Sequence, residues 1–451
     1  MTRYVKDGAF YRHLLLLTLP IAFQNIITYA IGFADNLMIG SLGEIAIDGI
    51  YVANQLTTVL QRLTIGLSSS MIILAAQYWG KKDLKSVKSV IGIGIKISLL
   101  AAVLMAAAVF LFPHQILGLF SDDAAVVAAG VEYVRIVCFT YALYCFTNIL
   151  ISAMRCVEVV RIGLYISIVT LVMNVSLNWI FIFGKLGCPA LGVKGAALAT
   201  LLSRLAEAGI MTWYIFFHDK RLKIRLGDLL RTDRLLLFDF IRYGLPVTAG
   251  SFLWGVNLAV QGAIVGRLGA VSIAAVSISG NIFNMVSVGM YGAATASSLI
   301  IGKTVGSGDI ERVKQYSRTL QLVFLGIGIV TGLFIFATRD LVLLFYTNIE
   351  EETRQLASWL LIELAVMSVG TAYQMATLTG IVRAGGATSF VLINDQLFVW
   401  LIVIPSACIA AFLFHAPTVV VFACLKCDQI LKCIVAYIKV NRFDWIKKLT
   451  R

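Results

Sequence analysis

"LPIAFQNIITYAIGFADNLMIGSLG", residues 19–43, decides the fold, because "LPVTAGSFLWGVNLAVQGAIVGRLG", residues 245–269, repeats its pattern in the second half of the chain. One fixed offset, which places Pro20 on Pro246, needs no gap as far as Lys88 and Lys314. It also aligns Gly40 with Gly266, Gly66 with Gly292, Gly80 with Gly306 and Asp83 with Asp309. Self-similarity at a fixed spacing indicates repeated structural units, so we predict two halves of one design.

The composition indicates a membrane protein. Of the 451 residues, 59% are hydrophobic and only 14% are charged, and the mean hydropathy is +0.90. A helix needs about 20 predominantly apolar residues to cross a bilayer. Twelve such spans are predicted, over residues 13–40, 50–78, 90–113, 126–153, 162–184, 194–218, 237–265, 277–303, 317–338, 355–382, 388–412 and 415–438. We therefore predict an all-α integral membrane protein.

The repeat fixes the predicted arrangement of these spans. Each half contains six spans, an even number, so both halves begin on the same side of the membrane. We expect two parallel six-helix bundles, related by a pseudo-two-fold axis along the membrane normal, which is a transporter architecture. The predicted domains are an N-terminal lobe (1–218), a cytoplasmic linker (219–236) and a C-terminal lobe (237–451).

The net charge of +13 follows the loops. Most Lys and Arg residues lie in the predicted loops of one side, including those at 81–88, 220–234 and 439–451. The loops of the other side contain Lys185, Lys194, Arg267, Arg339 and Arg354. Cytoplasmic loops carry the excess of Lys and Arg in membrane proteins. We therefore expect both termini to be cytoplasmic in a multi-pass protein of the cytoplasmic membrane, and no nucleic-acid partner.

Several other mechanisms lack their motifs. "GKT" at 302–304 ends like a P-loop, but Ser297 stands where that motif requires Gly, so we predict no ATP binding there. H-E-x-x-H and G-x-S-x-G are absent from the sequence, and we expect a protein that is not an enzyme and has no cofactor. "CLKC" at 424–427 has the spacing of zinc ligands without a second pair, and we interpret it as buried thiols. Uphill work would then depend on an ion gradient.

Motifs shared with a known family are spread over the whole chain. They are "AAQYWGKKD" (75–83), "NVSLNWIFIFGKLGCPALGVKGAALAT" (174–200), "GLPV" (244–247) and "GIVRAGGATSF" (380–390). Together with residues 19–43 they resemble the multidrug and toxic compound extrusion (MATE) family, and most of all its branch with the key acid in the first helix. The resemblance implies a secondary active transporter that antiports organic, often cationic, compounds or drugs against H⁺ or Na⁺. A flippase of lipids or lipid-linked precursors with the same superfamily fold is the alternative.

Three positions depart from the family's pattern. The acid that one branch carries on the seventh helix falls near Trp254 here, and a second carboxylate often found on the fifth helix is Asn178. The family's "GGDT" reads "GGAT", with Ala387. Because an indole offers one donor and no charge, we predict that the C-terminal lobe does not bind the coupling ion.

Asp35 is a carboxylate near the end of a long apolar span. At about 1.5 Å per helical residue from the outer end of each span, Asp35, Asn178 and Thr200 lie at similar depth. Asn174 lies one turn deeper than Asn178 on the same helix face. The family resemblance implies that these four residues form the cation site of the N-terminal lobe.

The energetics allow Asp35 to change its protonation state. A charge deep in a span costs about 2.5–3.5 kcal/mol, and neutralising an aspartate at pH 7 costs about 4 kcal/mol. Because these costs are similar, a bound cation can shift the balance. Both H⁺ and Na⁺ suit the site, and no other metal is expected. The structural alternative is an Asp35 that is permanently protonated and hydrogen-bonded to Asn174.

Other polar residues inside spans are candidates for a substrate cavity. These are Gln24, Asn54, Asn148, Gln261, Glu363, Gln374 and Asp395. Interhelical hydrogen bonds would explain them equally well. Glu132 with Arg135, and Arg204 with Glu207, have the spacing of helical ion pairs.

Pro20 and Pro246 lie inside the first spans of the two halves. Each proline removes a helix hydrogen bond and should bend its helix. We expect small organic substrates and membrane lipids as partners, and a monomeric chain.

Overall fold

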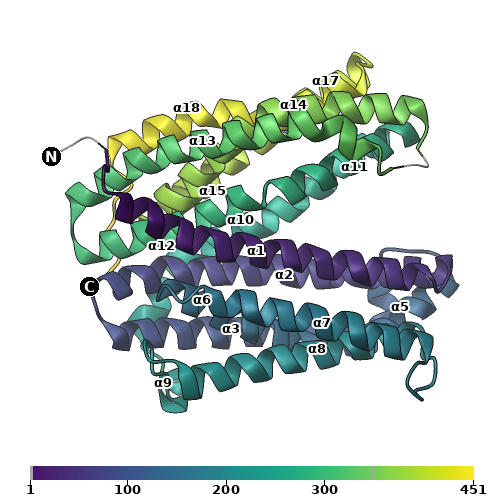
Figure 1. Ribbon diagram of the computed structural model, residues 1–451, viewed down its shortest axis with the longest axis horizontal. Helices are drawn as coiled ribbons and strands as arrows, with labels where there is room; N and C mark the ends of the chain where they lie inside the picture. The colour runs from purple at the N-terminus through teal and green to yellow at the C-terminus, as the bar shows by residue number, and fades with distance from the viewer. Residues whose placement is uncertain (1–3, 347–348, 451) are drawn as a thin grey trace. The chain divides into compact units, whose positions relative to one another are not determined.

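The computed structural model describes residues 4–346 and 349–450, which fold into helices joined by short connections (Figure 1). Up to the predicted linker the helices are α1 (Gly8–Gly40), α2 (Glu44–Gly80), α3 (Leu84–Leu111), α4 (Pro113–Leu117), α5 (Ala124–Val137), α6 (Thr140–Cys156), α7 (Arg161–Phe183), α8 (Val193–Trp213) and the π-helical turn η1 (Tyr214–His218). Those that follow are α9 (Leu226–Leu230), α10 (Arg234–Gly266), α11 (Ala270–Val286), α12 (Val288–Ser307), α13 (Ile310–Leu343), α14 (Glu351–Met375), η2 (Ala376–Val382), α15 (Thr388–Phe398), η3 (Val399–Val403), α16 (Ile404–Cys408), η4 (Ile409–Leu413), α17 (Thr418–Lys426) and α18 (Asp428–Arg442). The predicted all-α fold is confirmed.

Each predicted span corresponds to one helix or to one interrupted series of helices. By length and composition, eight helices of the described chain could cross a membrane, or ten spans if α5 with α6 and α11 with α12 each form one span. These two pairs bend by 52° and 45°. The two remaining predicted spans correspond to α8 and to α17 with α18, which carry charged residues within them.

The sequence repeat is present in the helices. α1 and α10 are both 33 residues long and begin and end at matched positions. α2 and α11 begin at matched positions, and so do α3 and α13. Asp83 and Asp309 cap α3 and α13 identically, each accepting a hydrogen bond at 3.1 Å from the backbone N–H three residues later. Gly43 and Gly269, before α2 and α11, have φ angles of +98° and +100°, which glycine adopts without strain.

The described chain divides into two compact units. The C-terminal unit consists of Met1–Ala22, Ala76–Lys82 and Ala249–Arg451, and the N-terminal unit consists of Phe23–Ala75 and Asp83–Thr248. These units differ from the predicted lobes, because the first part of α1 belongs to the C-terminal unit and the first part of α10 to the N-terminal unit. Ala22 and Thr248, where the two helices change unit, are matched positions of the repeat. The predicted linker 219–236 lies within the N-terminal unit.

Each unit has hydrophobic clusters of its own. In the N-terminal unit, residues of α2, α3, α5, α6 and α8 surround the fully buried side chains of Leu60 and Tyr141. In the C-terminal unit, one cluster lies among α11, α13 and α14, around Leu360 and Ile335. A second lies among α10, α16, η4 and α17, around Ala407. These clusters hold the helices that carry the polar residues described below.

Glycines permit close helix contacts at matched places in the two units. In the N-terminal unit, a Cβ added to Gly66 would lie 2.7 Å from the Cα of Thr248. In the C-terminal unit, a Cβ added to Gly292 would lie 3.0 Å from the backbone oxygen of Thr18 and close to Ala22. Thus α2 packs on α10, and α12, which corresponds to the later part of α2, packs on α1.

A reciprocal contact joins the ends of α2 and α12 within the C-terminal unit. A Cβ on Gly80 would collide with the backbone oxygen of Lys303, and a Cβ on Gly306 would collide with that of Gln77. Gln77 and Lys303 are themselves matched by the repeat. The two helix ends thus meet backbone to backbone, at a separation that only glycine allows.

The linker is attached to α3 through polar contacts. Lys88 forms an ion pair with Asp228 of α9 at 2.8 Å, and Lys96 donates to the hydroxyl of Thr232. The hydrogen bond from Lys88 holds the pKa of the Asp228 carboxyl below its usual range. Both side chains are only partly exposed, and one such ion pair near the surface contributes at most about 1 kcal/mol to stability.

We predict that Gly80→Ala and Gly306→Ala destabilise the protein to a similar degree, because each adds one methyl group to the same backbone contact. Overpacking of this kind costs about 1–3 kcal/mol. Thermal unfolding of the purified variants in detergent should show lowered Tm values. Gly209→Ala is the matched control, since a Cβ there meets no atom within 4 Å. A Tm for Gly80→Ala equal to that of Gly209→Ala would contradict the contact.

Candidate functional site

Asp35 of α1 and the two predicted asparagines of α7 lie together in the N-terminal unit. Asn178 donates its Nδ2 hydrogens to Asp35 Oδ1 at 2.6 Å and to Asn174 Oδ1 at 3.2 Å. Both asparagine side chains are buried, with 2% of their surface exposed. The structural alternative of a direct Asp35–Asn174 bond is replaced by one to Asn178, because Asn178 lies one turn nearer to Asp35.

The amide of Asn178 has an unused acceptor. Its Nδ2 faces Asp35, whose carboxylate only accepts hydrogen bonds when it is ionised, and in that state this orients the amide. Asn178 Oδ1 is then buried without a hydrogen-bond donor among the described residues. A buried oxygen without a donor is costly and indicates a missing proton donor or cation.

Three further groups lie near Asp35 or one contact away from it. Thr200 of α8 donates its hydroxyl hydrogen to the backbone oxygen of Ala196 at 3.0 Å, so toward other groups its hydroxyl oxygen can only accept. Tyr133 of α5 lies close to both Thr200 and Asp35. Arg204, also on α8, lies near enough to attract the Asp35 carboxylate. The four predicted residues therefore supply carboxylate, amide and hydroxyl oxygens, the ligand types that suit a hard cation or a proton.

The charge of Arg204 is already balanced. Its Nη1 lies 2.5 Å from Glu207 Oε2, so this predicted ion pair is confirmed. The guanidinium also lies 5.1 Å from the ring centre of Tyr144. The other predicted pair is wrong, since Glu132 lies 3.8 Å from Lys194 of α8 instead of pairing with Arg135. A contact between α5 and α8 there replaces one within α5.

The substrate-cavity candidates of the N-terminal unit do not form one cluster. Gln24 is buried and accepts a hydrogen bond from Arg155 at 2.6 Å. Asn148 donates to the backbone oxygen of Tyr144 on its own helix at 3.0 Å, and Asn54 is half-buried. These contacts favour structural roles for Gln24 and Asn148.

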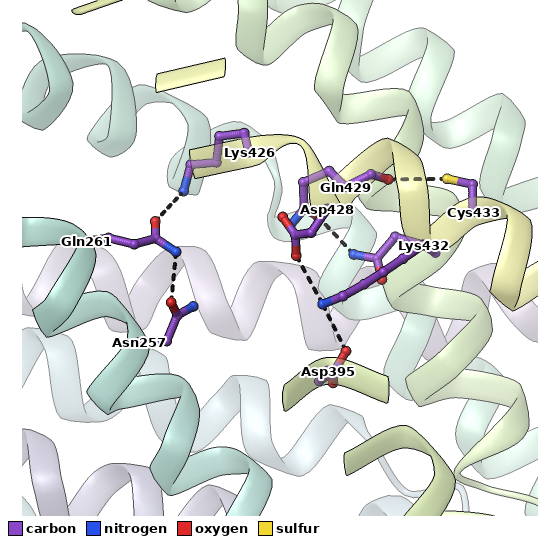
Figure 2. A network of polar contacts seen from close by, with 9 residues as sticks. Asn257, Gln261, Asp395, Lys426, Asp428, Gln429, Lys432 and Cys433 are labelled. Atoms are coloured by element: carbon purple, nitrogen blue, oxygen red, sulfur yellow. Dashed lines mark hydrogen bonds and ion pairs between the residues drawn. The ribbon is translucent and has the colours of Figure 1, made fainter. Parts of the chain in front are cut away.

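In the C-terminal unit, a buried lysine joins two carboxylates (Figure 2). Lys432 of α18, of which 2% is exposed, lies 3.0 Å from both Asp395 of α15 and Asp428 of α18. Gln429 donates to Asp428 at 3.0 Å and accepts from Gln374 of α14 at 2.9 Å. The predicted cavity residues Asp395 and Gln374 thus belong to one polar network.

A second network of the C-terminal unit runs along α10 (Figure 2). Lys426 of α17 donates to Gln261 Oε1 at 3.3 Å, and Gln261 Nε2 donates to Asn257 Oδ1 at 3.1 Å. Gln261 stands at the position that the repeat matches to Asp35. Glu363 of α14 belongs to neither network, and its buried Oε2 has no donor among the described residues.

Lys426, Asp428 and Lys432 were missed by sequence reasoning, although all three lie inside the predicted span 415–438. The four-residue spacing of Asp428 and Lys432 is that of a helical ion pair and could have identified it. The zinc-like "CLKC" that precedes them holds half-buried free thiols at Cys424 and Cys427. Within the described ranges, no group of three or more His, Cys, Asp or Glu residues could hold a metal ion.

Comparisons with known proteins agree with this architecture. The MatE family model matches residues 20–180 and 246–409, one match in each half of the chain. The chain belongs to the MatE family. It is 24% identical over 338 residues to a probable multidrug resistance protein, NorM, of Thermotoga maritima, covering 75% of this chain and 72% of that protein. It is also 24% identical over 407 residues to the multidrug resistance protein MdtK of Yersinia pseudotuberculosis, covering 90% and 88%.

Solved structures of MATE transporters share the fold of this family member. The D35N mutant of the Vibrio cholerae transporter VcmN superposes with a TM-score of 0.89 at 17% identity, over 98% of both chains. A MATE transporter in complex with MaL6 superposes with a TM-score of 0.87 at 19% identity, over 95% of both chains. The fold is therefore that of a twelve-helix membrane transporter.

We predict that Lys432→Met strongly destabilises the protein, because it leaves the buried carboxylate of Asp428 without its cation. Breaking a buried ion pair from one side costs about 3–5 kcal/mol. The double variant Lys432→Met/Asp428→Asn removes the unpaired charge and should recover part of this loss. Thermal unfolding in detergent measures both. Equal Tm values for wild type and Lys432→Met would contradict the network.

Proposed function

We propose that this protein is a secondary active efflux transporter, which exchanges organic, often cationic, compounds or drugs for H⁺ or Na⁺ across the cytoplasmic membrane. The observation that carries the proposal is the contact between Asp35, inside the apolar helix α1, and the buried Asn178 of α7, whose amide oxygen is unused. The names of the multidrug resistance proteins NorM and MdtK support the same function.

The proposed coupling cycle uses two states of Asp35. In one state the carboxylate holds a proton, or a sodium ion shared with oxygens of Asn174, Asn178 and Thr200. In the other state the cation has left and the ionised carboxylate is held by Asn178 and attracted by Arg204. Because a charge in a span is costly, each state favours a different packing around Asp35. A cation that binds one state better shifts the population toward it, and this difference can drive substrate export.

The prolines are proposed to serve this exchange. Pro20 and Pro246 lie inside the continuous helices α1 and α10. Each removes one backbone hydrogen bond, which makes its helix easier to bend. Pro20 precedes by two residues the point where α1 passes from the C-terminal to the N-terminal unit. We propose that bending at this place accompanies the change of state at Asp35.

The remaining features of the proposal concern the whole protein. The chain is a transporter rather than an enzyme, needs no cofactor beyond its coupling ion, and acts as a monomer on small organic molecules within the lipid bilayer. The two six-helix lobes, residues 1–218 and 237–451, are proposed to move so that the substrate site opens to one side of the membrane and then to the other. The C-terminal lobe does not bind the coupling ion, since Trp254 replaces an acid there. Both termini and residues 219–236 are cytoplasmic, which the distribution of Lys and Arg supports.

We predict that Asp35→Asn abolishes gradient-driven export, because the amide cannot release and rebind a proton or hold sodium by charge. The measurement is dye efflux from proteoliposomes under an imposed proton or sodium gradient, with substrate binding measured separately and expected to survive. Asp444→Asn is the matched control, since it neutralises a carboxylate that pairs with Lys439 away from every candidate site and should preserve export. Wild-type export rates in Asp35→Asn under both gradients would contradict the proposed coupling site.

We predict that position 220 faces the cytoplasm. Lys220→Cys should react with an impermeant maleimide only after the membrane of intact cells is opened. Native Cys188, in the connection between α7 and α8, is the internal control and should react from outside. Labelling of position 220 in intact cells, measured in a variant without Cys188, would reverse the topology.

A further inference from the structure

The network along α10 has an unmet demand for hydrogen-bond acceptors. Lys426 Nζ donates to Gln261 Oε1, and Gln261 Nε2 donates to Asn257 Oδ1. Asn257 Nδ2 is buried and has no acceptor among the described residues, and only 2% of the Asn257 side chain is exposed. We name these three residues, Asn257, Gln261 and Lys426, the α10 relay.

The lysine fixes the direction of the relay. An ammonium only donates, so Gln261 must present its oxygen to Lys426 and its amide hydrogens to Asn257. Asn257 must then present its oxygen to Gln261, which turns its own amide hydrogens toward the free end. Both ends of the relay therefore offer N–H groups, and a ligand that satisfies them must bring acceptor atoms.

Lys426 makes no direct ion pair among the described residues, and the carboxylate that acts on its charge, Asp428, is already paired with Lys432. Lys432, on the next helix, has two carboxylates at 3.0 Å, whereas no ion pair to Lys426 occurs among the described residues. Its other contact is the ring of Phe422, at 5.7 Å from the ring centre. A cation in the middle of a span costs about 2.5–3.5 kcal/mol, and residues retained at such a cost usually contact a substrate or an ion.

The repeat matches the middle residue of the relay to the proposed coupling residue, Asp35. Gln261 occupies on α10 the place that Asp35 occupies on α1. At Asp35 the side chain is anionic and Asn178 has an unused acceptor oxygen. At Gln261 the neighbouring charge is positive and Asn257 has an unused donor. The two matched places therefore have opposite polarity, and a cation suits only the first.

An apolar groove begins one helical turn from the relay along α10. Its volume is about 410 Å³, within the range of small-molecule sites, and Leu253, Leu392, Leu397 and Trp400 contribute to its lining. Leu253 precedes Asn257 by four residues, so the two side chains lie on one face of α10, one turn apart. A molecule with an apolar body and an anionic group could contact both.

We propose that the α10 relay binds the carboxylate of a transported compound, whose apolar body occupies the groove beside Leu253. The proposal rests on the proposed export function and extends its substrates from cations to compounds that carry a carboxylate. Lys426 supplies the charge, and Asn257 supplies a second hydrogen bond.

The test compares a rhodamine dye that has a free carboxylate with its ethyl ester, which has the same rings and no acidic group. Binding of each dye to purified protein is measured by fluorescence polarisation without any gradient. Because hydrogen bonds to charged groups are the strong ones, Lys426→Met should weaken binding of the acid about tenfold and of the ester less than twofold. Asn257→Asp should also weaken binding of the acid dye and leave binding of the ester unchanged. Lys426→Arg should retain binding of the acid dye.

Lys439→Met is the matched control, since it removes a lysine of α18 that pairs with Asp444 outside the relay, and it should change neither affinity. Equal losses for acid and ester in Lys426→Met, no loss, or no binding of the acid by wild type would overturn the proposal. If added phosphatidylglycerol displaced the bound acid dye from wild type but not the ester, the relay would be a site for lipid headgroups. That result would also overturn the proposal. Wild type that binds the acid through Lys426 but exports neither dye would overturn the export function alone.

Discussion

The backbone contact between the ends of α2 and α12 sets the geometry on which the rest of the structure depends. Gly80 meets Lys303 and Gly306 meets Gln77, so the same contact is made twice, once in each direction. The contact joins matched positions of the repeat, since Gly80 corresponds to Gly306 and Gln77 to Lys303. The matched starts of α2 with α11 and of α3 with α13, on either side of the contact, keep these positions in register. Insertion of one residue between Gln77 and Gly80, or between Lys303 and Gly306, would disrupt the pair of contacts.

Polar side chains are costly inside membrane-spanning helices, and those of this protein are satisfied to different degrees. Hydrogen bonds within a helix already satisfy its backbone, so each polar side chain needs a partner on another helix or a ligand. Lys432 with its two carboxylates and Arg204 with Glu207 are satisfied within the protein. Asn178 and Asn257 each have one buried atom without a partner. These two atoms, one acceptor and one donor, are the places where a ligand could complete the hydrogen bonding of each network.

The sequence was sufficient for the fold and for part of the site. Apolar length predicted where the spans lie, and the matched glycines and capping aspartates predicted the repeat, because these signals are local. Depth along each span, together with the family resemblance, predicted that Asp35, Asn174 and Asn178 meet, and they do. Local signals could not predict that Glu132 pairs with Lys194 or that Arg155 binds Gln24, since these partners are far apart in sequence. The division into compact units was also missed, because it depends on which residues α1 and α10 contact.

The comparison of Asp35 with Gln261 shows how one backbone can carry two chemistries. The repeat preserves the positions where these helices begin, the glycine turns and the capping aspartates, because an error in any of them would disturb the packing of both halves. Positions 35 and 261 lie within the matched helices α1 and α10 but are neither turn glycines nor capping residues. Their side chains can therefore differ without a change in the fold. An acid with an amide acceptor suits a small cation, whereas an amide beside a lysine suits an anionic group. In the proposed transporter, a coupling ion and a substrate need two dissimilar sites, and divergence at one matched position of the repeat would supply both without a change of fold.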